Sequence, residues 1–238
     1  ILTGIPDAQL FKFSSRNPQA LNQYTLINSL EGYEKHYFLG GDAEFNNFEG
    51  ILRNIEGLKM HTGIRPSVPP INVWGISDKD LLQEAHLVFT NTQAPFFAYI
   101  QTAGNHRPFQ RSIPISDSSF KRDSMDQLLL EKFGFESVDE YNAFRYTDYC
   151  FRHFFKLATQ SAYFANTIFV FIGDHGVAGN ANGVYPSLWT TQRLTDHHVP
   201  LLFYAPGLLA PQRRSEVVSQ IDVMPTIAGL LHRTYQNR

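Results

Sequence analysis

The sequence has little cysteine, little net charge and no long apolar run, and each of these absences excludes a class of structure or partner. Cys150 is the one cysteine, which excludes an internal disulfide but does not identify the redox compartment. The formal net charge is -2 at pH 7, so no overall field attracts nucleic acid or an anionic membrane. We therefore expect no nucleic-acid partner, and any anionic ligand must be held by a local site.

Long apolar runs are the third scarce feature. No stretch of about eighteen apolar residues occurs, so the sequence predicts no transmembrane helix. The chain starts at Ile1 with neither a basic segment nor a cleavage site, and it enters domain-like sequence at once. We expect further residues upstream in the full protein, and a membrane anchor would lie there.

The composition that is present predicts a folded globule. Hydrophobic residues make up 43% and aromatic residues 14% of the 238 residues, which is enough to bury a sizeable core. Residues 1–238 are interpreted as a single domain. Short runs of branched and aromatic residues alternate with longer helix-like segments, a pattern typical of a mostly parallel sheet.

Hydrophobic periodicity and turn residues predict the individual elements. The predicted strands are Lys35–Leu39, Phe96–Gln101, Thr167–Ile172 and Val199–Ala205. The predicted helices are Pro18–Leu30, Phe48–Ile55, Ser77–Phe89, Ser124–Phe133, Ser137–Tyr163 and Ile221–Leu231. In the fifth helix, Ser137 and Glu140 have the spacing of a capping box, and Cys150 lies on the apolar stripe, where we expect it in the core.

Asp174 and His175 directly follow a predicted strand and are flanked by Gly173 and Gly176. Ligands in open α/β sheets bind at the carboxyl ends of strands. An adjacent carboxylate and imidazole can supply oxygen and nitrogen ligands to one divalent ion such as zinc or manganese. The alternative is a turn with an Asx-type hydrogen bond and an incidental histidine.

A second candidate cluster is Asn105, His106 and Arg107, which follow the strand Phe96–Gln101. His106 emerges near the carboxyl end of that strand, and its two neighbours are donors suited to an anionic oxygen. The alternative is a loop histidine that is exposed to water.

Two further signals are weaker. Asp42 follows two glycines after a predicted strand, where it could belong to a binding loop or to a turn into the next helix. His197 and His198 precede a strand instead of following one. They reach the same edge as Asp174 only if that strand runs antiparallel or the loop folds over the site.

Five segments together resemble a known family. They are Gly40–Asn47, Asn105–Phe109, Asn166–Gly176, His198–Gly207 and Gln220–Ile227. In their order, and over nearly the whole chain, they resemble the sulfatase-type branch of the alkaline phosphatase superfamily, and within it the lipoteichoic acid synthase-like phosphoglycerol transferases. The resemblance implies an α/β sandwich with a mostly parallel central sheet flanked by helices. It also implies an enzyme that attacks a phosphate or sulfate ester with a metal-bound Thr, Ser or formylglycine.

The same resemblance implies roles for individual residues. These are metal ligation for Asp174 and His175, catalysis for His106 and His198, and substrate binding for Asp42, Asn105, Arg107 and His197. The implied metal is manganese or zinc, with calcium and magnesium as further candidates. The implied substrates are phosphate or sulfate esters of cell-envelope lipids or glycans, lipid-linked ones included. The implied location is extracytoplasmic, in the periplasm or at the cell surface, with a membrane tether in the full protein; no oligomeric state is predicted.

The sequence departs from the family pattern at three points. The nucleophile and the first metal-binding acid are expected upstream of Ile1, and Thr3 falls after the expected position of the nucleophile. Cys150 lacks the formylglycine signature Cys-x-Pro/Ala-x-Arg, and Phe45–Phe48 stands where phosphoglycerol transferases carry Trp and Arg. Two alternatives to a phosphoryl-ester enzyme therefore stay open: a sulfuric ester hydrolase, and a catalytically incomplete fragment that binds metal or anions only.

Overall fold

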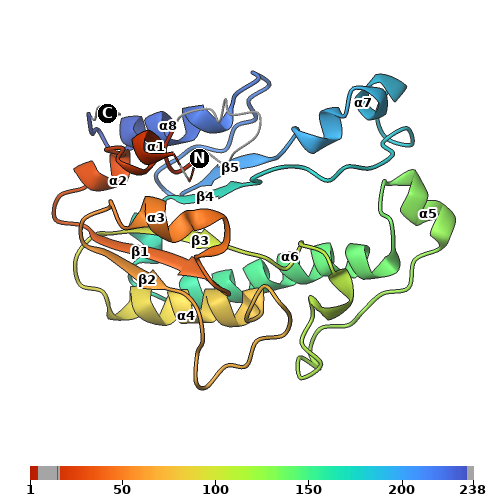
Figure 1. Ribbon diagram of the computed structural model, residues 1–238, viewed down its shortest axis with the longest axis horizontal. Coiled ribbons are helices and arrows are strands. Elements are labelled where there is room, and N and C mark those ends of the chain that lie inside the picture. Colours follow the sequence, from red (N-terminus) through yellow and green to blue (C-terminus); the bar gives the residue numbers. More distant parts are fainter. Residues whose placement is uncertain (5–14, 16, 235–238) are drawn as a thin grey trace. The chain divides into compact units, whose positions relative to one another are not determined.

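Residues 1–4, 15 and 17–234 are described by the computed structural model (Figure 1). The chain divides into two compact units. Unit 1 comprises Ile1–Pro69, Asn91–Gln101 and Gln212–Arg238, and unit 2 comprises Pro70–Thr90 and Thr102–Pro211.

Unit 1 is built on a parallel sheet of three strands in the order β2 (Leu58–His61), β1 (Glu34–Leu39) and β3 (Phe96–Gln101). The predictions of β1 and β3 are confirmed. β2 was not predicted, because its four residues, Leu-Lys-Met-His, include no β-branched side chain and fall between turns. The α/β class and the parallel sheet flanked by helices agree with the sequence prediction.

One face of this sheet carries the core of unit 1. Tyr37 and Leu39 of β1 are both buried, and they belong to a cluster with residues of α2 (Leu26–Ser29), α3 (Phe48–Leu52) and α8 (Val223–Leu230). Burying one large apolar side chain of this kind stabilises the fold by roughly 1.5–3 kcal/mol. The cluster therefore fixes these helices against β1.

The helix predicted over Pro18–Leu30 is wrong in one respect, because it is two short helices, α1 (Pro18–Leu21) and α2. Thr25 interrupts the helix and caps α2. Its backbone N–H donates to Asn28 Oδ1 at 2.9 Å. A side chain that satisfies a backbone N–H in this way competes with the continuous helical ladder.

Unit 2 contains the two longest helices, α4 (Asp78–Asn91) and α6 (Val138–Ala158), with α5 (Gln127–Lys132) and α7 (Ser187–Thr191). At the start of α6, the N–H of Glu140 donates to Ser137 Oγ at 3.1 Å, so the predicted cap is confirmed. The other half of the predicted box is absent here, because Glu140 Oε2 accepts from the N–H of Glu136 at 2.6 Å. Cys150 is 1% exposed, as expected for a core residue.

Most other predicted helices are confirmed with shifted ends, and α6 is shorter than predicted. It ends at Ala158, whereas the prediction ran to Tyr163. Beyond Ala158, the hydroxyl of Ser161 donates to the carbonyl of Leu157, which draws a backbone acceptor away from further helix. The short α7 was not predicted. None of the helices in the described part of the chain combines the length and the apolar character that crossing a membrane requires.

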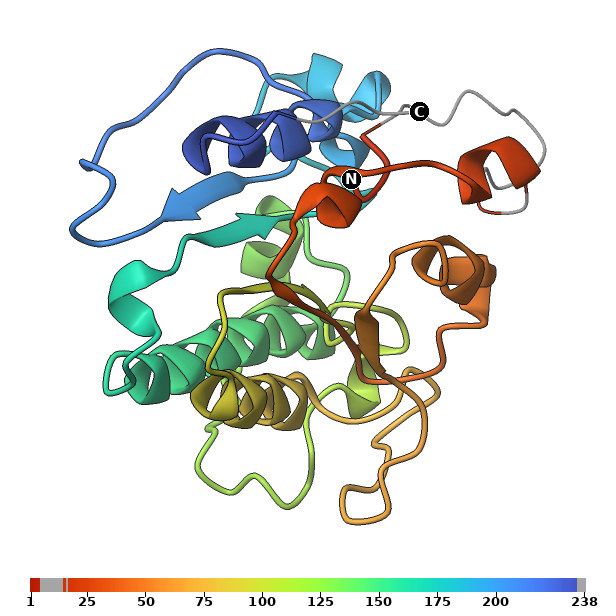
Figure 2. The ribbon, with the colours of Figure 1, turned by 90° about the vertical axis from the view of Figure 1, so that its left-hand side faces the viewer.

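The second sheet lies in unit 2 and is antiparallel. β4 (Phe169–Ile172) pairs with β5 (Leu201–Tyr204), with Ile172 opposite Leu201 (Figure 2). The aromatic ring of Phe155 on α6 packs against Phe169 at 5.0 Å between centroids and against Tyr204 at 5.5 Å. Both strands were predicted, but their antiparallel direction departs from the parallel pattern. The reversal brings the start of β5 to the end of β4.

Candidate active site

Asp174 and His175 occupy the turn that leaves β4. Asp174 Oδ1 accepts a hydrogen bond from the N–H of the next residue, His175, at 2.9 Å. An Asx turn would use the N–H two residues on, and that N–H, of Gly176, donates to the carbonyl of Asp196. The other carboxylate oxygen, Oδ2, lies 3.7 Å from His175 Nε2. The side chain of Asp174 is 77% exposed and that of His175 is 70% exposed. The turn therefore presents an oxygen and a nitrogen side by side to solvent.

This pair fits a shared divalent ion. Ligand atoms about 2.1 Å from a tetrahedral ion lie roughly 3.4 Å apart, close to the separation of the two atoms here. His175 Nδ1 lies 2.7 Å from the carbonyl oxygen of Gly176, and donation to that acceptor leaves the lone pair on Nε2. The described residues include no group of three or more His, Cys, Asp and Glu side chains that could hold a metal. Asp174 and His175 would thus supply two of the ligands.

The turn is packed closely against the segment that precedes β5. The N–H of Gly176 donates to the carbonyl of Asp196 at 2.8 Å. A Cβ atom at Gly176 would lie 1.8 Å from the carbonyl oxygen of Thr195, so only glycine fits at this position. This close approach fixes the backbone beside His175.

His197 and His198 lie at the same sheet edge as the Asp174 turn. The register between Ile172 and Leu201, continued outwards, sets His198 level with His175. The ring of His198 packs edge-on against Trp189 of α7, at 5.0 Å between centroids, and both histidines are exposed. The sequence placed these histidines beside Asp174 only if β5 ran antiparallel or the loop folded over the site. β5 does run antiparallel to β4.

Asn105 and His106 lie in the loop after β3. This loop is contacted by several side chains of unit 2. Asp78, at the start of α4, is 3% exposed, and its Oδ1 accepts from the N–H of Ala103 at 2.9 Å. Its Oδ2 accepts from the N–H of Gly104 at 3.0 Å. Burial raises the pKa of Asp78, while these bonds act in the opposite direction.

The next residues of the loop also have partners. The ring of Trp74 lies 3.7 Å from that of His106 between centroids, and Trp74 Nε1 donates to the carbonyl of Arg107 at 2.8 Å. Arg107 Nε donates to Glu136 Oε1 at 3.0 Å, and a second bond joins its Nη2 to Glu136 Oε2. The pairing raises the pKa of Arg107 and lowers that of Glu136. Part of the donor capacity predicted for anion binding is therefore engaged by a carboxylate.

Asp42 lies in unit 1, whereas the other predicted site residues lie in unit 2. Its Oδ1 accepts from the N–H of Glu44 at 2.9 Å, and the residue is exposed. Asn46 and Asn47 follow with φ angles of 52° and 55°, a left-handed turn that leads into α3. Asp42 thus forms the turn into the next helix that the sequence offered as one of two interpretations.

Sequence reasoning missed four residues that support the His106 loop: Trp74, Asp78, Glu136 and Thr147. Asp78 sits in the first turn of a helix, where an acidic residue is expected for reasons of helix stability alone. Its neighbour Ser77 forms the cap, with Oγ accepting from the N–H of Asp80 at 3.1 Å. No local pattern connects such a residue with a loop more than twenty positions away, so only tertiary structure finds it.

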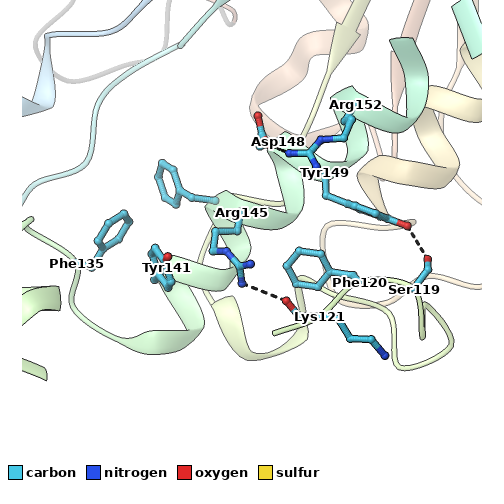
Figure 3. Close-up of a pocket in the computed structure, with 10 residues that line it drawn as sticks. Ser119, Phe120, Lys121, Phe135, Tyr141, Arg145, Asp148, Tyr149 and Arg152 are labelled. Carbon is cyan, nitrogen blue, oxygen red and sulfur yellow. Dashed lines mark hydrogen bonds and ion pairs between the residues drawn. The ribbon is translucent and has the colours of Figure 1, made fainter. Parts of the chain in front are cut away.

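A pocket of about 590 Å³ lies elsewhere in unit 2, between the loop before α5 and one face of α6 (Figure 3). It contains none of the predicted site residues. Its cations already have partners: Arg145 donates to the carbonyl of Lys121, Arg152 to Asp148, and Lys121 to the carbonyl of Ser118. These side chains stabilise the local fold, and we do not assign the pocket to the site.

Comparison with solved structures identifies the class of fold. A protein in the alkaline phosphatase superfamily from Vibrio parahaemolyticus superimposes with a TM-score of 0.74 at 23% identity, covering 100% of this chain and 54% of that one. The lipoteichoic acid synthase LtaP from Listeria monocytogenes gives a TM-score of 0.73 at 18% identity, covering 100% of this chain and 59% of that one. The fold is that of the alkaline phosphatase superfamily.

The family follows from the sequence comparison. The sulfatase family model matches residues 1–233. Lipoteichoic acid synthase 1 from Bacillus subtilis (strain 168) is 26% identical over 238 residues, which cover 95% of this chain and 35% of the relative. The chain belongs to the sulfatase family of enzymes, as the five motifs predicted. It spans about a third of the length of this curated relative.

Proposed function

We propose that the full protein is a metal-dependent enzyme that transfers or hydrolyses a phosphoryl ester of a cell-envelope lipid or glycan. The observation that carries the proposal is the turn after β4, where Asp174 Oδ2 and His175 Nε2 lie 3.7 Å apart in a chain of the sulfatase family. A carboxylate with an imidazole suits manganese or zinc. A relative named lipoteichoic acid synthase supports a cell-envelope substrate.

A bound ion would supply positive charge to the ester oxygens and lower the pKa of a hydroxyl nucleophile. The residues of this chain would bind the ester and donate protons and hydrogen bonds to it. Of His106 and His198, one protonates the leaving oxygen and the other donates to an equatorial oxygen of the transferred group, as does Asn105. Arg107 keeps its bonds to Glu136 and offers its remaining N–H groups to the ester. His197 contacts the rest of the substrate.

The proposed substrate also sets the proposed location. We infer that the enzyme works outside the cytoplasm, in the periplasm or at the cell surface, on lipid-linked esters, and that a tether holds it at the membrane. The assignment is supported by the lipoteichoic acid synthases among its relatives.

A sulfuric ester hydrolase is the second candidate, supported by the name of the matching family model. The formylglycine of such sulfatases is made from a cysteine in the signature Cys-x-Pro/Ala-x-Arg, which Cys150 lacks. Cys150 is 1% exposed within α6, and burial raises the pKa of its thiol. This cysteine is therefore no candidate for that conversion. We favour the phosphoryl ester because a relative is named lipoteichoic acid synthase.

The test compares phosphate diesters with sulfate esters in the full protein, using bis(p-nitrophenyl) phosphate and p-nitrophenyl sulfate with added manganese or zinc. We expect turnover of the phosphate ester, and Asp174→Asn and His175→Ala should each lower kcat/KM roughly a hundredfold or more. Calorimetric titration with manganese should show the same loss of affinity.

Asp148→Asn is the matched control, since Asp148 is 75% exposed and forms an i,i+4 pair with Arg152 on the surface of α6. Its turnover should equal that of the wild type. Preferential cleavage of the sulfate ester would instead favour the second candidate. Metal-dependent turnover that survives Asp174→Asn would refute the assignment of the ligand pair.

A further inference from the structure

The loop that carries Asn105 and His106 contains no helix or strand, so its conformation depends on its partners. The main partner is the carboxylate of Asp78, which accepts N–H groups from Ala103 and Gly104. Hydrogen bonds to a carboxylate are stronger than those between neutral groups. A Cβ atom on Gly104 would lie 2.4 Å from Asp78 Oδ2, so glycine is what allows the loop to approach this closely.

Thr147 of α6 extends this support to the side chain of Asn105. Its hydroxyl lies 2.9 Å from Asn105 Oδ1, compared with 3.3 Å from the carbonyl of Ala143 and 3.4 Å from Asp78 Oδ2. A hydroxyl has a single hydrogen to donate, and the nearest acceptor is the amide oxygen of Asn105. Thr147 is 8% exposed whereas Asn105 is exposed. The amide oxygen therefore faces the protein, and the NH2 end faces away from Thr147.

From this geometry we propose that Asp78 and Thr147 are positioning residues that hold the NH2 group of Asn105 toward the transferred group, as a hydrogen-bond donor to one of its oxygens. The inference rests on the proposed function. An exposed asparagine that lacked this support could rotate by 180° and present its carbonyl oxygen, which would repel an anionic ester. Thr147 fixes the polarity of the amide, and Asp78 fixes the backbone from which the amide projects.

The test uses a double-mutant cycle in the full protein, in which the variants are Thr147→Val, Asn105→Ala and their combination. Thr147→Val keeps the shape of the side chain but removes the hydroxyl. We expect it to lower kcat for the phosphate diester about tenfold with KM little changed, as for a donor used in the transition state. In the Asn105→Ala background, the same change should have no further effect. Thr147→Ser restores the hydroxyl and should restore kcat.

A loss of equal size in both backgrounds would show that Thr147 acts on structure alone, and full activity of Thr147→Val would show that it has no role. A second readout needs no turnover. Titration with inorganic phosphate should shift the side-chain NH2 resonances of Asn105 in the wild type and in Thr147→Ser, but much less in Thr147→Val. An equal shift in all three proteins would overturn the positioning role, whereas a wild type without metal-dependent turnover would overturn the proposed function itself.

Discussion

Asp78 and Asp117 show how the surroundings of a single carboxylate decide the direction of its pKa shift. For Asp78, burial raises the pKa and outweighs the hydrogen bonds that it accepts. Burial also acts to raise the pKa of Asp117, but hydrogen bonds from Lys79, Ser119 and Tyr146 outweigh it, and the pKa is lowered. The two carboxylates should therefore respond to pH in opposite ways.

The first prediction compares the stability of Asp78→Asn and Asp117→Asn with that of the wild type. A raised folded pKa means that the contribution of Asp78 to the free energy of unfolding is present below its unfolded pKa and is lost as the pH rises through the folded value. A lowered folded pKa means that the contribution of Asp117 is present above its unfolded pKa and is lost as the pH falls through the folded value.

Urea unfolding from about pH 2 to about pH 8 measures both differences, because the change for Asp117 falls below about pH 4. The free energy of unfolding of the wild type minus that of Asp78→Asn should decrease as the pH rises. The free energy of unfolding of the wild type minus that of Asp117→Asn should increase. Each variant is the control for the other. Differences that change in the same direction would contradict the stated causes of the shifts.

At the scale of elements, the turn after β4 depends on one glycine. We predict that Gly176→Ala weakens manganese binding and lowers the free energy of unfolding by about 2 kcal/mol or more, because the new Cβ collides with backbone and the turn must shift. Gly229→Ala in α8 is the matched control. A Cβ there meets nothing within 4 Å, and alanine in a helix should stabilise by about 0.5–1 kcal/mol. Chemical denaturation and calorimetric titration measure both effects, and a neutral Gly176→Ala would show that the turn is not held as described.

Elements with a strong local signal could be predicted from the sequence, and those decided by distant contacts could not. β1 and β3 are apolar runs bounded by turns, and α6 has both a capping serine and an apolar stripe. The direction of β5 depends on the path of the chain between β4 and β5, which no local pattern encodes.

The candidate site divides in the same way. Asp174 and His175 could be found because they follow a strand directly, and their close approach results from adjacency in the chain. Thr147 lies in the middle of a helix, and its link to Asn105 exists only because α6 packs beside the loop. Residues that hold a site in place carry no motif of their own.

At the scale of the whole molecule, the sulfatase family model runs through both compact units. We propose that residues 1–238 form a single domain, and we predict one cooperative unfolding transition. The two tryptophans, Trp74 and Trp189, both lie in unit 2, so their fluorescence reports on that unit, whereas circular dichroism reports on both. The two transitions should coincide in urea. A dichroism change separated from the fluorescence change would indicate that the units unfold independently.

Because β4 and β5 pair antiparallel, the chain between them forms a long hairpin. Its stem is fixed, whereas its tip is free of the strand ladder. The strand ladder and the bond from Gly176 to Asp196 close the stem, and the two histidine-bearing segments lie on it. The chain between residues 177 and 195, which includes α7, leaves and returns at one edge. Loop closure costs little more for a longer loop, so insertions or deletions at the tip should be tolerated without displacing the stem. Under the function proposed above, substrate range would then change at the tip while the ligand pair on the stem stays the same.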